Sequence, residues 1–308
     1  MPLVTSKEIL QAALEGHFAV GAFNANNMEQ VQAIVDAAVE ERAPVILQVS
    51  QGAIRYAGLE FAAAMVKTAA AEADVPVVLH LDHGTDFDQN IRCLRAGFTS
   101  LMYDGSKAPY EENVAVTSRV AHIAHVCGIP VEAELGKVLQ SADGVTEEDV
   151  RAAMTNPAQA RDFVERTGCD ALAIACGSVH AMRSAEAELD IERIQAIHAA
   201  IPETPLVLHG SSGVKEESEV EAIKHGISKI NVATMLNQAF TRALRETLAA
   251  LPVEESDPRK FLLGSRDAVK EVVRHKMRLF GSSGTVTSSG FVSPATTHRT
   301  ANIGGTEA

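Results

Sequence analysis

Short apolar segments, each followed by a stretch with helical periodicity, alternate along most of this chain. There are eight of them, at residues 19–25, 44–50, 76–82, 100–104, 130–135, 171–176, 205–209 and 229–233. Several are nearly continuous in Val, Ile, Leu and Ala, which is typical of parallel strands covered on both faces. Eight strand–helix units in one chain predict an α/β fold, the closed (β/α)8 TIM barrel. A doubly wound open sheet is the alternative, but it rarely needs eight regular units.

Helical segments fill the spaces between these strands and continue past the last one. Residues 27–42, for example, place apolar side chains at helical spacing. Two further helices, at residues 234–251 and 258–279, follow the eighth strand, so we expect extra C-terminal helices on the barrel. We expect residues 1–281 to form a single domain, and the Ser-, Thr- and Gly-rich residues 282–308 to form a flexible polar tail.

The composition narrows the classes of partner. A net charge of −13, no Trp and 4% aromatic residues disfavour binding to nucleic acid or to anionic membranes. No apolar run is long enough for a membrane span, and the N-terminal residues lack the layout of a signal peptide. The four cysteines form no C-x-x-C pair and lie in or beside apolar segments, which predicts buried free thiols in a reducing compartment. We therefore expect a cytoplasmic protein.

Three histidines end or follow apolar segments at equivalent points of the predicted barrel. They are His83, His180 and His209, placed after the third, sixth and seventh strands. In a (β/α)8 barrel the carboxyl ends of all strands meet at one rim, so three distant imidazoles can converge there. Three neutral imidazoles with an open fourth position are the ligand set of a catalytic zinc. His80, two positions inside the third strand, is expected to pack in the barrel instead.

Carboxylates and other polar residues stand at the same rim. Asp82 precedes His83, and we interpret it as a helix cap, as a residue orienting a metal ligand, or as a general acid/base. Asp104 and Glu134 fit either capping or a second, harder cation site. Asn24 and Ser50 end the first two strands, and Glu132 lies near the end of the fifth.

Two turns near the end of the barrel are suited to an anion. Gly210, Ser211 and Ser212 precede one helix, and Asn231, Val232, Ala233 and Thr234 precede the next. Backbone N–H groups and hydroxyls at helix N-termini bind anions, and phosphate sites after strands seven and eight recur in this fold. Together the two turns predict a phosphate site.

The chain resembles the class II, metal-dependent ketose-bisphosphate aldolases from about residue 1 to residue 284. The motifs that carry the resemblance are 22–29 (AFNANNME), 79–84 (LHLDHG), 102–106 (MYDGS), 109–113 (PYEEN), 132–136 (EAELG), 209–213 (HGSSG), 229–234 (KINVAT) and 257–260 (DPRK). The resemblance implies cleavage of a ketose bisphosphate, with fructose 1,6-bisphosphate expected, to dihydroxyacetone phosphate and glyceraldehyde 3-phosphate through a zinc-stabilised enediolate. A tagatose-bisphosphate or other phosphoketose aldolase is the close alternative.

The resemblance also implies roles for individual residues. The three histidines would hold Zn²⁺, Asp104 and Glu134 would line a second position for a divalent or monovalent cation, and Asp82 would exchange protons during carbon–carbon bond making. The two turns would hold the phosphate of dihydroxyacetone phosphate. Arg259 matches an arginine that helps to bind the far phosphate, often across a subunit boundary, and members of the family are dimers or tetramers.

Two departures from the family pattern stand in the loops. Ser141 and Ala142 occupy the region where a glutamate is implicated in taking the substrate's C–H proton, and Asp143 is the nearest acid. Ala181 follows the strand-six histidine, where the family commonly has Gly beside the phosphate. These changes leave the choice among phosphoketoses open.

Three other hypotheses remain. Lys229 on the eighth strand could form a Schiff base, but this would leave the histidines unexplained. A barrel metallohydrolase is disfavoured because no H-x-H pair ends the first strand. A non-catalytic metal-binding barrel is motivated by the altered loop after strand five.

Overall fold

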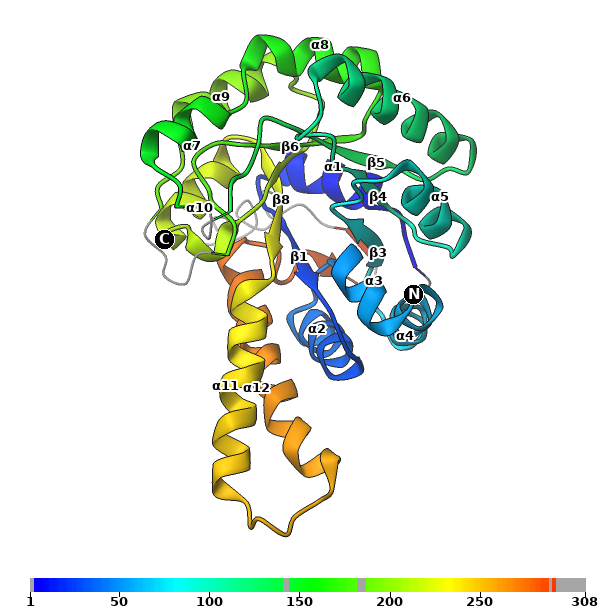
Figure 1. The fold of residues 1–308 in the computed structure, drawn as a ribbon, viewed down its shortest axis with the longest axis vertical. Coiled ribbons are helices and arrows are strands. Elements are labelled where there is room, and N and C mark those ends of the chain that lie inside the picture. The colour runs from blue at the N-terminus through cyan, green and yellow to red at the C-terminus, as the bar shows by residue number, and fades with distance from the viewer. Residues whose placement is uncertain (1–2, 141–143, 182–186, 288–289, 292–308) are drawn as a thin grey trace, which may run out of the picture.

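Eight parallel strands form a nearly closed barrel in the computed structural model, which describes residues 3–140, 144–181, 187–287 and 290–291 (Figure 1). The strands are β1 (Val20–Asn24), β2 (Val45–Ser50), β3 (Val77–Asp82), β4 (Leu101–Tyr103), β5 (Val131–Leu135), β6 (Ala171–Ile174), β7 (Leu206–Leu208) and β8 (Ile227–Val232). Their order is β3-β2-β1-β8-β7-β6-β5-β4, and bridges from His80 to Ser100 and from Gly84 to Tyr103 join β3 to β4. The predicted (β/α)8 barrel is confirmed, and the open-sheet alternative is wrong.

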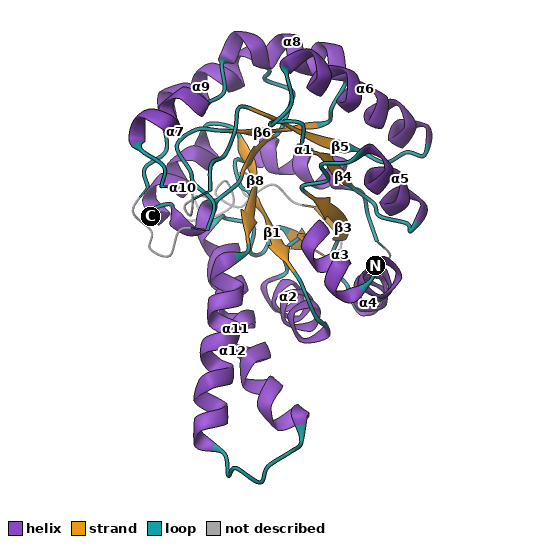
Figure 2. Ribbon diagram, viewed as in Figure 1, coloured by secondary structure: helices purple, strands orange, loops and turns teal. Residues whose placement is uncertain are grey.

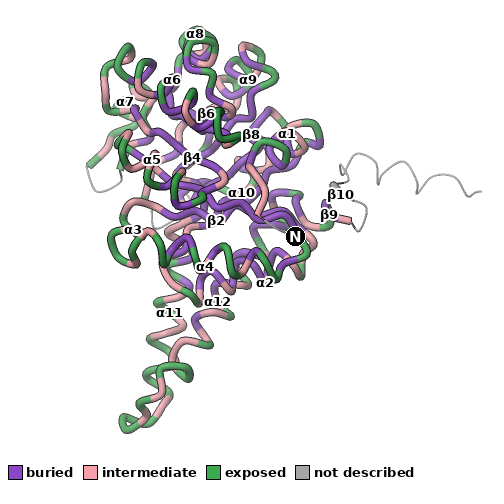
Figure 3. The backbone as a smooth tube through the Cα atoms, turned by 90° about the vertical axis from the view of Figure 1, so that its right-hand side faces the viewer, coloured by how far each residue is buried: buried purple, intermediate pink, exposed green. Residues whose placement is uncertain are grey.

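Helices surround the strands, as Figure 2 shows. They are α1 (Ser6–Gly16), α2 (Met28–Glu41), α3 (Gln51–Ala57), α4 (Leu59–Glu72), α5 (Phe87–Arg95), α6 (Tyr110–Val126), α7 (Glu147–Ala153), α8 (Pro157–Thr167), α9 (Ile191–Ala200), α10 (Glu216–Lys224), α11 (Thr234–Ala250) and α12 (Pro258–Leu279). Their buried faces pack on outward-facing Val, Ile and Leu side chains of the strands, and the strands themselves form the buried centre of the molecule (Figure 3). This two-sided cover explains the continuous apolar runs in the sequence.

Helix α1, which the sequence did not predict, closes one end of the barrel. Its Ile9, Leu10 and Ala13 pack in one buried cluster with inward-facing strand residues such as Val20 and Val78. These strand residues lie in the first halves of their strands, so α1 covers the amino-terminal end. The carboxyl-terminal rim stays free for a site.

Helices α11 and α12 project from the barrel as a long hairpin (Figure 1). The C-terminal part of α12 returns to pack along α2, where Arg266 pairs with Asp36 and Lys270 pairs with Glu40. The extra C-terminal helices expected from the sequence are therefore present. No helix in the described parts of the chain is both long and apolar enough to cross a membrane.

The expected boundary between the folded domain and its tail, at residues 281 and 282, needs correction. Ser282, Thr285 and Val286 are buried, and the N–H groups of Gly284 and Val286 donate to the carbonyls at the end of α2, so the packed chain continues past residue 281. A short pair of strands, β9 (Val286–Thr287) and β10 (Gly290–Phe291), follows. Residues 292–308 of the predicted tail lie outside the described residues.

The cysteines are all free, as expected, but they are not all buried. Cys93, Cys169 and Cys176 are buried, whereas Cys127 is exposed at the C-terminal end of α6. Its neighbour Val126 is exposed as well, so the apolar residues around Cys127 in the sequence do not bury this end of α6.

Candidate active site

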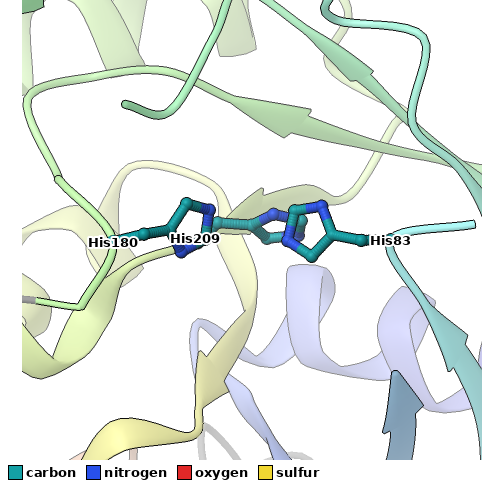
Figure 4. Close-up of side chains that lie close together, drawn as sticks. All are labelled: His83, His180 and His209. Atoms are coloured by element: carbon teal, nitrogen blue, oxygen red, sulfur yellow. The ribbon is translucent and has the colours of Figure 1, made fainter. Parts of the chain in front are cut away.

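Three imidazole rings face one another at the carboxyl-terminal rim of the barrel (Figure 4). The ring centroids of His83 and His209 lie 4.6 Å apart, those of His83 and His180 lie 5.2 Å apart, and those of His180 and His209 lie 6.0 Å apart. One ring nitrogen of each lies within 4.8 Å of those of the other two, as a shared cation requires. The structure thus brings together the three histidines that the sequence singled out.

The three rings reach this point from different kinds of backbone. His83 directly follows β3 with a left-handed φ of 49°, and His209 directly follows β7. His180 lies in the loop six residues beyond the end of β6, where its N–H donates to the carbonyl of Leu139 (2.8 Å). The sequence run that seemed to end at His180 is therefore a short strand followed by a loop.

Hydrogen bonds to carboxylates fix which nitrogen of the His83 and His209 rings faces the site. His83 donates from Nδ1 to Asp104 Oδ2 (2.8 Å). His209 donates from Nε2 to Glu132 Oε1 (3.0 Å), so its Nδ1 is directed toward the other rings. A carboxylate on the outer nitrogen is the usual orienting partner of a metal-bound histidine.

Two buried atoms at the centre of the site have no hydrogen-bond partner among the residues that the structure describes. They are His209 Nδ1 and Glu134 Oε2, which lie 3.3 Å apart. Unpaired buried polar atoms are costly, and a cation between a ring nitrogen and a carboxylate oxygen would satisfy both. The residues present therefore fit a bound metal ion.

A second group of candidate ligands adjoins the first. Asp104 follows β4 and Glu134 lies on β5, and each offers an oxygen within 4.8 Å of a His83 nitrogen. These are the two carboxylates expected at a second cation position. Asp104 also accepts hydrogen bonds from the N–H and hydroxyl of Ser106, so it orders its own loop as well.

The carboxylates control the charge of the rings. Burial lowers the pKa of His209, but Glu132 and Glu134 outweigh this and raise the pKa to about 10. For His83, Asp82 and Asp104 likewise outweigh burial and raise the pKa. A bound cation would replace these protons as the counter-charge of the carboxylates, because metal ligation requires neutral imidazoles.

Among the described residues no carboxylate pairs with the third ring, His180, and its pKa moves in the opposite direction. Burial, followed by the charges of His83 and His209, lowers the pKa of His180 to about 3. His180 is therefore neutral near pH 7 and ready to act as a ligand.

Asp82 ends β3 beside the rings. It is buried, it accepts hydrogen bonds from the side-chain amides of Asn24 (2.7 Å) and Asn231 (3.4 Å), and its Oδ1 lies 4.0 Å from His83 Nε2. Burial raises the pKa of Asp82, but the charges of His83 and His209 outweigh it and lower the pKa. The N-cap of the following helix α5 is Asp86, so the capping interpretation of Asp82 is wrong.

The two predicted anion turns enclose one small cavity of about 90 Å³ next to the rings. Ser211 donates to the backbone carbonyl of Asn231 (2.5 Å), which joins the turns. Helix α11 begins at Thr234 on the wall of this cavity, so its N-terminal N–H groups lie nearby. The candidate residues that line the cavity are Asn24, Ala181, Gly210, Ser211, Ser212, Asn231, Ala233 and Thr234.

Three predicted site residues lie elsewhere. Val232 is fully buried at the end of β8 and does not line the cavity, so its side chain belongs to the core. Ser50 lines a larger cavity of about 650 Å³, which the sequence did not separate from the first. Arg259 lies at the outer end of the hairpin, 89% exposed and paired with Asp257, so the structure does not bring it to the site of its own chain.

Glu132 and Lys229 also differ from the sequence expectation. Glu132 does not line the rim cavities but lies inside the barrel, where its Oε2 is 2.6 Å from Lys229 Nζ. Lys229 is buried in this ion pair rather than open to a substrate carbonyl. His80, as expected, is buried inside the barrel next to them, with its Nε2 3.3 Å from Lys229 Nζ.

Three basic residues at the rim were not predicted from the sequence. Arg55, Lys107 and Lys137 line the larger cavity, and within the described residues none of them has an ion-pair partner. Each follows a strand by a few residues, which is the signal that could have identified them. Ser141, Ala142 and Asp143, named above as departures, lie outside the described residues.

A family model described as class II fructose-bisphosphate aldolase matches residues 4–285. The chain belongs to this family. Members of the family are metal-dependent carbon–carbon lyases, so the metallohydrolase alternative is overturned.

Individual relatives agree with this assignment. The chain is 48% identical over 287 residues to a fructose-bisphosphate aldolase of Geobacillus stearothermophilus, and 45% identical over 305 residues to one of Thermus caldophilus. Each comparison covers 92% of this chain and 99% of the relative. Among solved structures, the YdjI aldolase of Escherichia coli K12 superposes with a TM-score of 0.80 at 36% identity, covering 92% of this chain and 98% of the other.

Proposed function

We propose that this class II aldolase reversibly cleaves fructose 1,6-bisphosphate to dihydroxyacetone phosphate and glyceraldehyde 3-phosphate. The observation that carries the proposal is the convergence of His83, His180 and His209 beside Asp82, next to a cavity built from two anion-binding turns. Relatives at 43–48% identity carry the name fructose-bisphosphate aldolase, which favours this substrate over its tagatose epimer.

Zinc is the proposed metal, because three imidazoles with one open position suit Zn²⁺. Asp104 and Glu134 are proposed to hold a second cation. When bound, the zinc supplies Lewis acidity to the ketose carbonyl and stabilises the negative charge that bond cleavage leaves on the three-carbon fragment.

Asp82 is the proposed proton-transfer residue. Its lowered pKa keeps it ionised, so in the cleavage direction it accepts the proton of the C4 hydroxyl as the C3–C4 bond breaks. The electron pair of that bond remains on C3, and C4 becomes the aldehyde carbon. Asn24 and Asn231 hold the carboxylate in place, since both donate to it.

Phosphate binding is assigned to the two turns. Gly210, Ser211 and Ser212, together with Ala233 and Thr234, offer backbone N–H groups and hydroxyls around the small cavity. Ala181 has a left-handed φ of 60° on the wall of this cavity, a backbone conformation that suits the glycine usual in the family.

The larger cavity supports a substrate with a second phosphate. In the described part of the chain Arg55, Lys107 and Lys137 have no carboxylate partner there, although the protein carries a net charge of −13. Lys107→Ala and Lys137→Ala should raise KM for the bisphosphate more than KM for fructose 1-phosphate. Arg92→Ala, which removes an exposed cation of α5 outside both rim cavities, is the control and should change neither.

We also propose that the protein forms a homo-oligomer and resides in the cytoplasm. Exposed Leu248, Val253 and Leu263 on the projecting hairpin support a homodimer or homotetramer, in which Arg259 would reach the site of a neighbouring subunit. Four free cysteines support a reducing cytoplasm.

A chelator and borohydride test the mechanism together. Chelation should abolish cleavage and added Zn²⁺ should restore it, whereas borohydride with substrate should leave activity intact. Inactivation by borohydride alone would point to Lys229 and a Schiff base. Rates on the fructose and tagatose bisphosphates decide the epimer, and bound zinc without any cleavage of either would favour the non-catalytic alternative.

A further inference from the structure

A row of buried polar side chains crosses the barrel directly beneath the three imidazoles. Lys229 and Glu132, 1% and 3% exposed, form an ion pair of 2.6 Å between β8 and β5. Lys229 Nζ also donates to His80 Nε2 (3.3 Å), and His80 Nδ1 lies 2.8 Å from the hydroxyl of Ser100. Every member of the row therefore has a partner.

Only one end of this row reaches the candidate metal site. Glu132 uses Oε2 for Lys229 and Oε1 to accept a hydrogen bond from His209 Nε2. The ring of His209 is thereby held with Nδ1 toward the other imidazoles, and this atom has no hydrogen-bond partner within the described ranges. Rotation of the Glu132 carboxylate would break both contacts.

We propose that Glu132 and Lys229 are positioning residues for the metal, an inference that rests on the proposed zinc site. Lys229 fixes the Glu132 carboxylate, and Glu132 fixes the His209 ring in the tautomer and orientation that present Nδ1 to the metal. Such carboxylate partners of metal ligands contribute a factor of about 10–100 to metal affinity. The role assigned to Lys229 is structural support of a ligand, not covalent catalysis.

The alternative is that the ion pair only stabilises the barrel. Removing one partner of a buried ion pair destabilises a protein strongly, whereas replacing both by neutral groups is often tolerated. The test is therefore the double variant Glu132→Gln with Lys229→Met. It removes both charges while the glutamine carbonyl can still accept from His209.

Zinc affinity, measured on folded protein by competition with a chromophoric chelator, is the main readout. The visible spectrum of the Co²⁺-substituted protein reports ligand geometry, and urea unfolding of the metal-free proteins reports stability. We expect the double variant to recover much of the stability lost by Glu132→Gln alone. It should still bind Zn²⁺ about 10-fold or more weakly and should show an altered Co²⁺ spectrum, because an amide is a weaker acceptor than a carboxylate.

A matched control exists elsewhere in the chain. Lys276 and Glu219 form a second buried pair, 2.7 Å apart and 2% and 0% exposed, between α12 and α10, and neither lines the rim cavities. Glu219→Gln with Lys276→Met should leave zinc affinity and the Co²⁺ spectrum unchanged.

Wild-type zinc affinity and an unchanged Co²⁺ spectrum in a folded Glu132/Lys229 double variant would overturn the inference. So would an equal loss of affinity in the Glu219/Lys276 control. A wild-type protein that binds no zinc would instead refute the proposed function itself.

Discussion

A methyl group added at Gly210 is expected to destabilise the protein through two separable effects. Gly210 has a φ of 68°, a conformation in which an L-residue destabilises the folded state by about 1–2 kcal/mol. Alanine also lowers the conformational entropy of the unfolded chain relative to glycine, which offsets about 0.4–1 kcal/mol of this loss. The new Cβ would also stand 3.0 Å from the carbonyl carbon and oxygen of Val179, which move only with the segment that carries His180. Overpacking of this kind costs about 1–3 kcal/mol. We therefore expect Gly210→Ala to lose about 2–4 kcal/mol.

Gly168 offers a control with the same backbone and no clash. Its φ is 67°, it ends α8, and a Cβ there would meet no atom of the described residues within 4 Å. Gly168→Ala should therefore cost about 1 kcal/mol or less and leave kcat/KM unchanged. Urea unfolding of both variants gives the difference, which isolates the contact with Val179.

The same contact should affect catalysis. Because a shift of about 1 Å in catalytic groups can cost about 100-fold in rate, displacement of the His180 segment should lower kcat/KM of Gly210→Ala by about 10–100-fold. Equal losses of stability in Gly210→Ala and Gly168→Ala would show that the Val179 backbone yields freely, and would refute this reasoning.

Three further predictions follow from the site and its surroundings. Asp82→Asn should lower kcat by about 10²–10⁴-fold at unchanged zinc content, measured by a coupled assay and metal analysis, and near-normal kcat would exclude Asp82 as the proton-transfer residue. Removal of zinc by a chelator should lower the melting temperature as well as the activity, because a ligand at 1,000 times its Kd stabilises the folded protein by about 4 kcal/mol. An unchanged melting temperature would contradict a tightly bound zinc ion. Burial raises the pKa of Glu41, but hydrogen bonds from Arg278 and Arg274 outweigh it and lower the pKa from 4.5 to about 2. The stability that Glu41 contributes is therefore complete above about pH 4.5 and is lost as the pH falls toward 2. In denaturation curves, Glu41→Gln should lower the free energy of unfolding by about 2 kcal/mol at pH 7 and by progressively less below pH 4.5. A difference that does not change with pH would refute the assigned ion pairs.

The sequence predicted the barrel and the three histidines for the same physical reason. Parallel strands buried on both faces produce apolar runs, and the residue after each run must lie at the common rim. His83 and His209 follow their strands directly, so their convergence could be inferred without knowing any contact. His180 converges by a different route, because its loop hydrogen-bonds to the loop after β5.

Depth within the barrel is what the sequence could not supply. Glu132 and Glu134 are two positions apart on β5, so their side chains leave the same face of the strand, but they lie about 6–7 Å apart along it. That spacing separates the rim layer from the layer beneath it. Which layer a residue joins depends on the stagger of neighbouring strands, for instance the pairing of Val207 with Lys229, and no local pattern encodes that stagger.

The layers of the barrel interior explain why charged residues occur where apolar ones would fold as well. Val20 and Val78 pack with α1 in an apolar layer at the amino-terminal end of the barrel. If packing were the only requirement, the next layer toward the carboxyl-terminal rim could be apolar too. Instead that layer contains Lys229 and Glu132, whose burial carries a desolvation cost. The cost is understandable if the layer orients the rim, because a carboxylate fixed from below holds His209 without using any loop. The position of His209 would then depend on strands, while Ala181, Lys107 and Lys137, which lie on loops, could change with the substrate.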